Sequence, residues 1–288
     1  MRLIVHIGFH KTASTYLQHL LNLNADALAA RGVWYQRQPD YPAHHAAAWA
    51  LLNGDASHLE RMIADAQAAG CGTAILSSED LEGAIFNPGV AALIEEAAAD
   101  AGVTTLEWHA AIREPGAYFE SMCAQLAYHT YGDSLFMFTE VMKKGMLFVP
   151  EPQPGRDAVP YWFYCFDHFA YLTGFAAVPG RALFVHDYAD RTPYPGWRMV
   201  DRLGVMDVLT TVPNEAGHNH RLAPEQVAQF YRDRVREATG DAATWGMVSE
   251  AVDRSIAASQ GTAPVYARAV GHHYADSYRM AVERFCRW

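Results

Sequence analysis

Cysteine is scarce in this sequence, and long hydrophobic runs are missing. The four cysteines stand far apart and form no CxxC pair: Cys71, Cys123, Cys165 and Cys286. Disulfide scaffolds and cysteine metal sites use tighter spacing, so we expect four reduced thiols and a cytoplasmic, reducing compartment. No stretch approaches the roughly eighteen apolar residues of a membrane-spanning helix. The N-terminus also lacks the long apolar region and cleavage site of a signal peptide.

Basic charge is in deficit as well. The 288 residues include 22 Lys and Arg against 32 Asp and Glu, which gives a net charge of −10. Nucleic acids and anionic membranes bind proteins with a strong basic excess, so neither is an expected partner. A local basic pocket for one small anion remains compatible with this balance. Hydrophobic residues make up 51% and charged residues 19%, a composition that excludes intrinsic disorder.

Short apolar runs alternate with helical patterns along the chain. We predict strands at residues 2–7, 33–35, 73–77, 104–112 and 182–185. We predict helices from Ser14 or Thr15 onward with a hydroxyl N-cap, at 44–69, at 90–101, from Pro115 to about 128, near 161–173, and through the tail from about 224. This alternation predicts one α/β domain over residues 1–288, with a mainly parallel sheet covered by helices on both faces.

A proline-rich segment interrupts the alternation. Four prolines lie within residues 145–160, and proline removes backbone donors, so we predict a surface loop or lid there. An aromatic run, YWFYCF, follows at residues 161–166. We interpret it mainly as core packing, with a wall of a substrate pocket as the alternative.

The first predicted strand leads into a turn rich in hydrogen-bond donors. The turn places Lys11, Thr12, Ala13, Ser14 and Thr15 at the start of a helix. Free backbone N–H groups, the helix dipole, a lysine and three hydroxyls together favour a phosphate or phosphosulfate group. The alternative is an ordinary turn whose hydroxyls only cap the helix. The segment is not a Walker A loop, because His10 stands where that motif has glycine.

A second motif follows the strand at residues 104–112. Arg113 ends that strand, and Ser121 lies eight residues later on the next helix. Both can face the carboxyl edge of the sheet, where ligands bind in open α/β folds. A guanidinium fork and a hydroxyl suit a phosphate group. A surface ion pair for Arg113 and no role for Ser121 is the alternative.

A third feature places a carboxylate at the same edge. Glu79 directly follows the strand at residues 73–77, where it could accept a proton from a hydroxyl group. A helix N-cap region is the alternative interpretation of Ser78 and Glu79. We expect Asp80 and Glu82 to be solvated. His109 is a second candidate for the base, and His10 lies beside Lys11. The paired histidines of the chain lack the spacing of a catalytic zinc site, so no metal is expected.

These three motifs, in this order, resemble the PAPS-dependent sulfotransferase family, where PAPS is 3′-phosphoadenosine-5′-phosphosulfate. The family's 5′-phosphosulfate loop, roughly KTGTT, stands here as KTAST at residues 11–15, with Ala13 and Ser14 in place of glycine and threonine. The family's 3′-phosphate motif RxPxxxxxS corresponds to Arg113 through Ser121. Glu79 occupies the position of the catalytic glutamate of several bacterial and carbohydrate sulfotransferases. The resemblance covers residues 1–25 and 75–125.

The resemblance implies an activity and a set of roles. PAPS would be the sulfuryl donor and PAP, 3′-phosphoadenosine 5′-phosphate, the product, with no metal required. Lys11 would stabilise charge on the leaving phosphate, and Glu79 would be the general base. Residues 11–15, Arg113 and Ser121 would bind the nucleotide, and Arg221 is a further candidate for the 3′-phosphate site. The acidic net charge favours a small hydroxylated acceptor, whose identity the sequence leaves open together with the oligomeric state.

Two rival functions remain open at this point. One is a kinase that uses ATP and Mg²⁺, with Asp187 at the end of the strand ALFVHD as a metal ligand. The missing glycine–lysine pair argues against it. The other is a non-catalytic protein of the same fold that binds PAP or another nucleotide. Only Glu79 and the acceptor pocket separate this rival from the enzyme.

Overall fold

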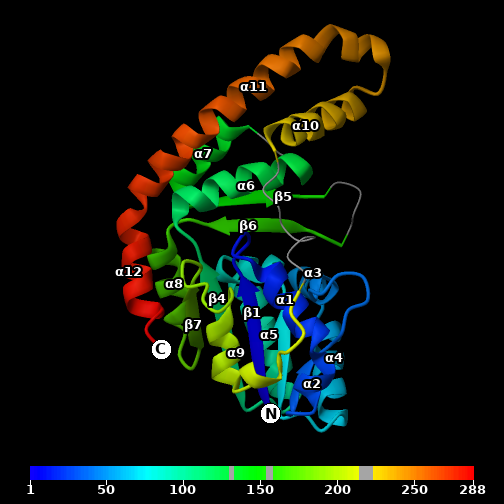
Figure 1. The fold of residues 1–288 in the computed structure, drawn as a ribbon, viewed down its shortest axis with the longest axis vertical. Helices are drawn as coiled ribbons and strands as arrows, with labels where there is room; N and C mark the ends of the chain where they lie inside the picture. The colour runs from blue at the N-terminus through cyan, green and yellow to red at the C-terminus, as the bar shows by residue number, and fades with distance from the viewer. Residues whose placement is uncertain (130–132, 154–157, 214–222) are drawn as a thin grey trace.

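A five-stranded parallel sheet forms the centre of the protein (Figure 1). The structure is a computed structural model that describes residues 1–129, 133–153, 158–213 and 223–288. The strand order is β2-β3-β1-β4-β7, and the strands are β1 (Arg2–Gly8), β2 (Val33–Tyr35), β3 (Thr73–Ser77), β4 (Thr105–Ile112) and β7 (Ala182–Asp187). The predicted α/β class with a parallel sheet is confirmed.

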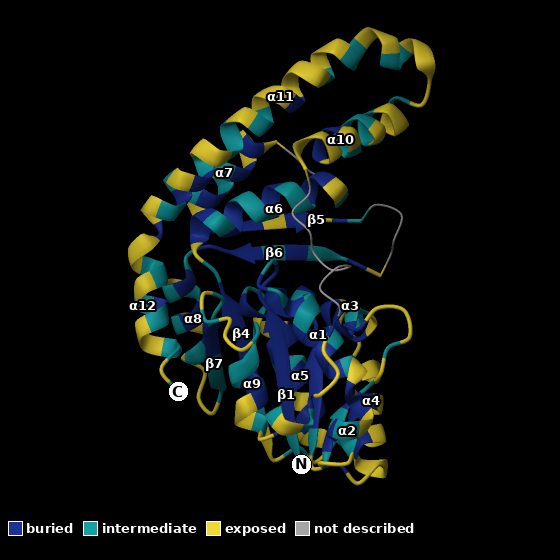
Figure 2. Cartoon of the chain, viewed as in Figure 1, coloured by how far each residue is buried: buried dark blue, intermediate teal, exposed yellow. Residues whose placement is uncertain are grey.

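Alternate residues of β1 face two different helical layers. Ile4 packs in a cluster with α1 (Ser14–Leu23), α2 (Ala25–Ala29) and α9 (Trp197–Leu203), and the short helix η2 (Met206–Val208) follows α9. Leu3, Val5 and Ile7 face the larger cluster on the other side. That cluster includes α3 (His45–Leu52), α4 (Ser57–Ala68), α5 (Pro88–Asp100), α6 (Pro115–His129) and α8 (His168–Ala176). The two-residue period of a strand therefore divides the core into two layers. Figure 2 shows this sheet as the buried centre of the molecule.

A β-hairpin lies beyond the carboxyl edge of the sheet (Figure 1). Strands β5 (Met146–Pro150) and β6 (Tyr161–Cys165) pair antiparallel. The predicted loop at 145–160 is therefore partly wrong, because its first residues form a strand, while residues 154–157 lie outside the described part of the chain. The predicted helix near 161–173 is also wrong over its first residues. Trp162 and Tyr164 are buried, and Tyr161 and Phe163 are partly exposed, which is the two-residue period of a strand rather than a helical one.

Two smaller predictions also need correction. The helix predicted at 44–69 is two helices, α3 and α4, separated by a turn in which Gly54 has a positive φ. The hydroxyl N-cap predicted for α1 is absent: Ala13 is the cap residue and makes no side-chain cap bond. Ser14 is instead the first helical residue, so its hydroxyl cannot occupy the capping position.

Helices occupy the described C-terminal part of the chain. They are α10 (Pro224–Thr239), α11 (Ala242–His273) and α12 (Ala275–Phe285). The long α11 packs on α6, on α7 (Ser134–Lys144) and on α10. Figures 1 and 2 show α10 and the adjoining part of α11 as a projecting, largely exposed helical arm. Among the described residues, none of the helices has the length and apolarity needed to cross a membrane.

Candidate active site

The loops after β1 and β4 meet at the carboxyl edge of the sheet. β1 and β4 are neighbours, yet the chain leaves β1 toward β2 and leaves β4 toward β7 on the opposite side. Such a change of direction opens a crevice between the two loops, where ligands of open α/β sheets bind. The loop after β1 carries Lys11, and the loop after β4 carries Arg113. We call residues 9–15 the Lys11 turn.

The backbone of the Lys11 turn has the geometry of an anion site. Lys11 and Ala13 have φ angles of 60° and 63°. Alternation with left-handed residues turns successive N–H groups toward one concave side, which favours an anion. Within the described chain, the N–H groups of residues 11–15 make no hydrogen bond. Two of them belong to the first turn of α1, whose dipole adds to the attraction.

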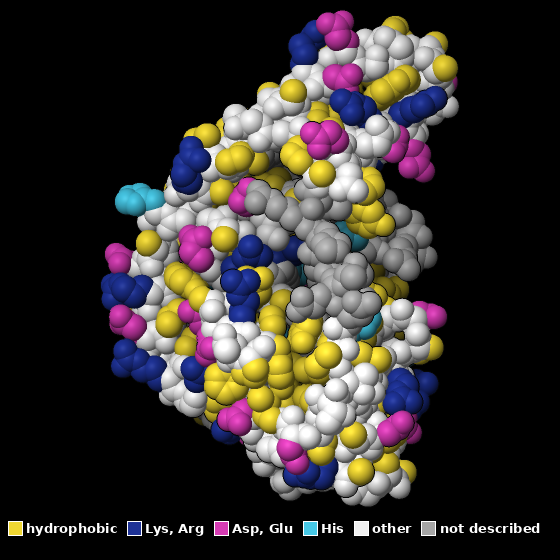
Figure 3. Space-filling model, viewed as in Figure 1, with side chains coloured by type: hydrophobic (Ala, Val, Ile, Leu, Met, Phe, Trp, Pro, Cys, Tyr) yellow, Lys and Arg dark blue, Asp and Glu magenta, His cyan; other side chains and the backbone are white. Residues whose placement is uncertain are grey.

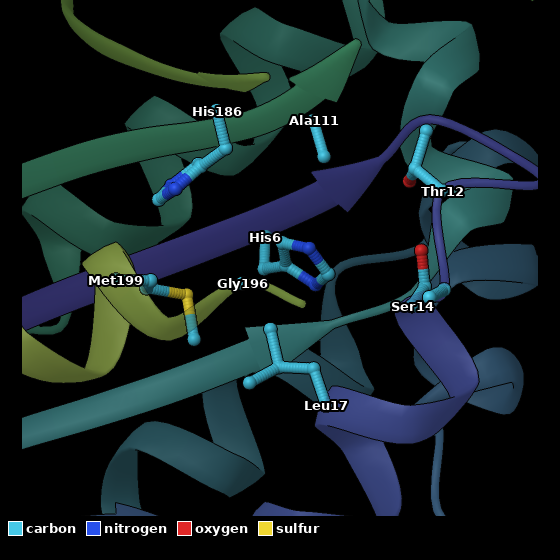
Figure 4. Close-up of a pocket in the computed structure, with 9 residues that line it drawn as sticks. His6, Thr12, Ser14, Leu17, Ala111, His186, Gly196 and Met199 are labelled. Carbon is cyan, nitrogen blue, oxygen red and sulfur yellow. The ribbon is translucent and has the colours of Figure 1, made fainter. Parts of the chain in front are cut away.

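The hydroxyl groups of Thr12 and Ser14 form hydrogen bonds within the turn, unlike its free backbone N–H groups. Thr12 and Ser14 donate to the main-chain oxygen of Phe9, at 2.5 and 3.3 Å. Both side chains lie at a cavity of about 10 Å³ beneath the turn, beside His6 and His186 (Figure 4). This space is the size of one water molecule. In the structure both hydroxyls are donated within the turn, and the prediction that they bind an anion stays a prediction. The hydroxyl of Thr15 contacts that of Tyr41 at 3.1 Å.

A cleft of about 700 Å³ opens on the other side of the turn. Its size is suitable for a nucleotide. Lys11, Ala13, Arg113 and Ser121 all line it, together with residues of α10 and α11 that include Val227, Phe230, Tyr231 and Gln260. Figure 3 shows Lys and Arg side chains near the middle of one face, below the helical arm. The structure thus brings two motifs together that lie about a hundred residues apart in the sequence.

Arg113 links the two loops that flank the cleft. Its Nη1 donates to the main-chain oxygen of Lys11 at 2.9 Å, and its guanidinium carbon lies 4.9 Å from the ring centre of Tyr188. Its Nε is buried without a hydrogen-bond partner among the described residues. Buried donors are normally satisfied, so this nitrogen is a donor that a bound anion can use. Ser121 lines the same cleft from α6.

Burial and two charged neighbours, Glu79 and Arg113, affect the pKa of Lys11. Burial lowers the pKa of its ammonium group below the usual value; Glu79 opposes this shift and Arg113 adds to it. Burial of the Lys11 cation and the nearby Arg113 strengthen the attraction for a further anion, and the Glu79 carboxylate opposes it. Lys11 lines the cleft, whereas Glu79 is not among the described residues that line it.

Glu79 lies at the edge of the sheet beside the Lys11 turn. Its Oε2 accepts a hydrogen bond from Gln18 Nε2 at 2.8 Å. Ser78 caps the short helix η1 (Glu79–Ile85) by accepting from the N–H of Asp80, so the N-cap interpretation of Ser78 is confirmed. The approach of this segment to β1 requires glycine at position 8. A Cβ on Gly8 would lie 2.9 Å from the Cβ of Glu79, and the φ of Gly8 is 81°.

Asp80 and Glu82 are buried, and the expectation that they are solvated is wrong. Their exposed fractions are 3% and 0%. Both contact the ring of His10, which is itself 2% exposed: Nδ1 lies 2.8 Å from Glu82 Oε2 and Nε2 lies 3.4 Å from Asp80 Oδ1. Burial alone would lower the pKa of His10, but Asp80 and Glu82 raise it to about 9. The two carboxylates therefore favour the protonated ring of His10 over the neutral base.

His109 is not placed to act on a bound acceptor. It is fully buried in β4, where it contacts His186 at 3.2 Å and Glu107 at 3.3 Å. Burial lowers the pKa of its imidazole, and Glu107 only partly offsets this. The sequence suggested proximity because His109 lies four positions before Arg113, but its side chain points into the layer between the sheet and α9. Arg221 lies outside the described residues.

Sequence reasoning missed two parts of the site. One is the buried set around His10, which also includes His45, at 2.9 Å from Asp80. Its signal was the run Glu79, Asp80, Glu82 directly after an apolar strand. The other is the wall of the cleft on α10 and α11, which no local pattern indicated. The described residues contain no group of three or more His, Cys, Asp or Glu side chains arranged to hold a metal ion. No family model, curated protein or solved structure matches the chain.

Proposed function

We propose that this protein is a sulfotransferase that moves the sulfuryl group of PAPS to a hydroxyl group of a small acceptor. The observation that carries the proposal is the convergence of Lys11, Arg113 and Ser121 on one cleft of about 700 Å³. These residues come from the two motifs that resemble the family's 5′-phosphosulfate and 3′-phosphate sites. Their meeting at one crevice is what a donor with phosphates at both ends requires.

The donor would lie across the crevice between the two loops. The free N–H groups of the Lys11 turn and the Lys11 ammonium would bind the 5′-phosphosulfate end. Arg113 and Ser121, on the β4–α6 side, would bind the 3′-phosphate. The side chains of α10 and α11 that line the cleft would cover the nucleoside. In this arrangement the hydroxyls of Thr12 and Ser14 shape the turn and do not contact the donor.

The residues around the turn have the chemistry for in-line sulfuryl transfer. Glu79 would accept the proton of the acceptor hydroxyl while the acceptor oxygen forms its bond to sulfur. The bond between sulfur and the 5′-phosphate oxygen breaks, and that oxygen keeps the electron pair. Lys11 and the N–H groups of the turn would stabilise this charge, as oxyanion donors do. Gln18, bound to Glu79 at 2.8 Å, would orient the carboxylate.

Charge favours a small acceptor over a polyanion. The chain has a net charge of −10, and the proposed base, Glu79, would add a further negative charge next to the acceptor. A polyanionic acceptor would be repelled by both. A neutral molecule with a hydroxyl group is therefore the class that we propose.

The kinase alternative has less support than the sulfotransferase. The Asp187 carboxylate that would bind magnesium accepts from Tyr278 OH at 2.6 Å and from the N–H of Ala189 at 2.8 Å. These contacts occupy Oδ1 with structural donors. A protein that only binds PAP remains the second candidate, because the cleft alone does not require turnover.

Turnover with PAPS tests the proposal. Purified protein is incubated with PAPS and pools of hydroxylated small molecules, and both PAP and sulfated products are measured by mass spectrometry. The proposal expects a sulfated product and an equal amount of PAP, both lost in Glu79→Gln. PAP binding without any product from broad pools would favour the binding protein. Transfer from ATP with Mg²⁺, and none from PAPS, would favour the kinase.

A further inference from the structure

Both ring nitrogens of His10 face carboxylate oxygens. Nδ1 lies 2.8 Å from Glu82 Oε2, and Nε2 lies 3.4 Å from Asp80 Oδ1. Nε2 makes no hydrogen bond among the described residues. Two buried carboxylates within 3.4 Å of one ring nevertheless favour its doubly protonated form over the neutral one.

Glu82 contacts both the main chain and the side chain of His10 in the Lys11 turn. The N–H of His10 donates to the same Oε2 at 3.0 Å. The Glu82 carboxylate is in turn fixed by two elements on its other side, since it accepts from the N–H of Cys165 at 2.6 Å and from Tyr118 OH at 3.1 Å. The turn is thus attached, through one buried carboxylate, to α6 and to β6.

Asp80 connects the same ring to the neighbouring segment. It lies 2.9 Å from His45 Nδ1 on α3 and directly follows Glu79 in the chain. Asp80 and Glu82 both belong to η1, the helix that begins at Glu79. The contacts of His10 therefore join the turn that would bind the donor to the segment that carries the proposed base.

We propose that His10 is a positioning residue, a buried imidazolium whose ion pairs with Asp80 and Glu82 fix the Lys11 turn against the Glu79 segment. We call His10, Asp80 and Glu82 the His10 clamp. The clamp orients the free N–H groups of the turn toward the cleft and places a fixed positive charge behind them. The identity of the bound anion rests on the proposed sulfotransferase function; the clamp itself rests on the contacts of these three residues.

The clamp makes anion binding depend on the charge of one buried ring. The other titratable groups that face His10 come from four elements: His45 on α3, Asp80 and Glu82 on η1, His129 and Tyr118 on α6, and Tyr164 on β6. His129 is held neutral, because burial, Arg234 and His10 lower its pKa to about 4. The pKa of His45 is about 8 and that of His10 about 9, so His45 is already neutral when His10 loses its proton. Loss of the His10 proton would therefore leave Asp80 and Glu82 without a histidine cation and release the turn.

The experiment compares the full-length protein with the double variant His10→Gln/Glu82→Gln. The two amides keep hydrogen-bonding groups at both positions and remove both charges, so no single buried charge is left without its partner. A matched control, His58→Gln/Glu60→Gln, makes the same exchange on the exposed side of α4.

Three measurements decide the proposal. Nitrogen NMR of the wild type is expected to show both ring nitrogens of His10 protonated at pH 8. The backbone amide resonances of residues 11–15 are expected to shift in the double variant and not in the control. Between pH 7 and pH 9.5, the PAP affinity of the wild type is expected to fall more than that of the double variant. The difference between the two falls should be at least about tenfold, which is the change in an equilibrium constant that one pKa unit represents.

The results separate the clamp from the proposed activity. A His10 ring with one protonated nitrogen at pH 7 overturns the clamp. So do unshifted turn amides in the double variant, or identical pH profiles of PAP affinity. A wild-type protein that binds no PAP overturns the sulfotransferase instead, and the ring protonation and the turn amides then decide the clamp alone.

Discussion

Arg113 donates a hydrogen bond to the main-chain oxygen of Lys11 across 2.9 Å. This contact joins the loop after β4 to the turn after β1, so the two proposed phosphate sites share one structural link. A substitution of Arg113 would therefore disturb the Lys11 turn as well as the binding of a phosphate. Ser121, on α6, lacks this second role and is the cleaner probe of the 3′-phosphate site.

Replacing Ser121 with alanine is expected to weaken PAP binding about ten- to a hundredfold, the value of one hydrogen bond to a charged group. Binding of adenosine 5′-phosphate, which lacks the 3′-phosphate, should change little. Isothermal titration calorimetry with both ligands measures the difference. Ser255→Ala, on an exposed part of α11, is the matched control. Equal losses for the two ligands would place the 3′-phosphate elsewhere.

Lys11 is expected to act mainly on the transition state, where the leaving oxygen gains charge. Lys11→Ala should therefore lower kcat about 10²- to 10³-fold, the scale of one lost oxyanion donor. PAP affinity should fall by a smaller factor. Steady-state kinetics and calorimetry on the same preparation give the two values. Weaker binding with normal kcat would assign Lys11 to ground-state binding alone.

Glu79→Gln keeps the shape of the side chain and removes the proton acceptor. Turnover is expected to fall roughly 10²- to 10⁴-fold while PAP binding stays intact. Glu96→Gln, on the exposed face of α5, is the control and should retain full activity. His109→Ala is expected to reduce stability, since His109 is buried among Glu107 and His186. Normal turnover in Glu79→Gln would exclude Glu79 as the base.

Stability is expected to fall on the alkaline side of neutrality. Burial lowers the pKa of His10 and of His45, but their carboxylate neighbours raise the net values to about 9 and about 8, from 6.5 in the unfolded chain. A raised pKa gives stability that is complete below pH 6.5 and is lost as the pH rises through the folded value. Urea unfolding from pH 7 to pH 9.5 measures the loss.

A variant isolates the His10 contribution to this pH dependence. His10→Gln is expected to be less stable at pH 7, because Asp80 then keeps only His45 as a cationic partner and Glu82 loses its ion pair with His10. Its stability should also decline less between pH 8 and pH 9.5 than that of the wild type. Parallel curves for the two proteins would show that His10 does not titrate with a raised pKa.

Much of the sheet could be predicted because its strands carry strong local signals. The runs predicted at 73–77 and 104–112 are mostly apolar and are followed by Ser78 and Arg113, so both their type and their carboxyl edge could be predicted. The aromatic run at 161–166 was not, because every position is apolar or aromatic and neither period stands out. Its pairing with β5 decides the structure, and that pairing is a long-range contact.

The sequence predicted which residues lie at the candidate site, but not the directions of their side chains. Lys11, Arg113 and Ser121 could be placed at one edge from strand ends alone. The directions of the Thr12 and Ser14 hydroxyls depend on the left-handed backbone of Lys11 and Ala13, which the sequence does not reveal. The burial of Asp80 and Glu82 depends on His10, about seventy residues earlier in the chain. The run of carboxylates after the strand indicated a cluster there, but it could not identify His10 as the partner.

The selectivity of the cleft for PAP tests the central claim most directly. Thermal unfolding of the wild-type protein is measured with PAP, with adenosine 5′-phosphate, and with ATP and Mg²⁺. At a concentration one hundred times its Kd, PAP is expected to add about 2.7 kcal/mol of stability. The other two nucleotides should add far less at the same concentration. Equal stabilisation by all three, or none by PAP, would contradict the assignment of Lys11, Arg113 and Ser121 to a PAPS site.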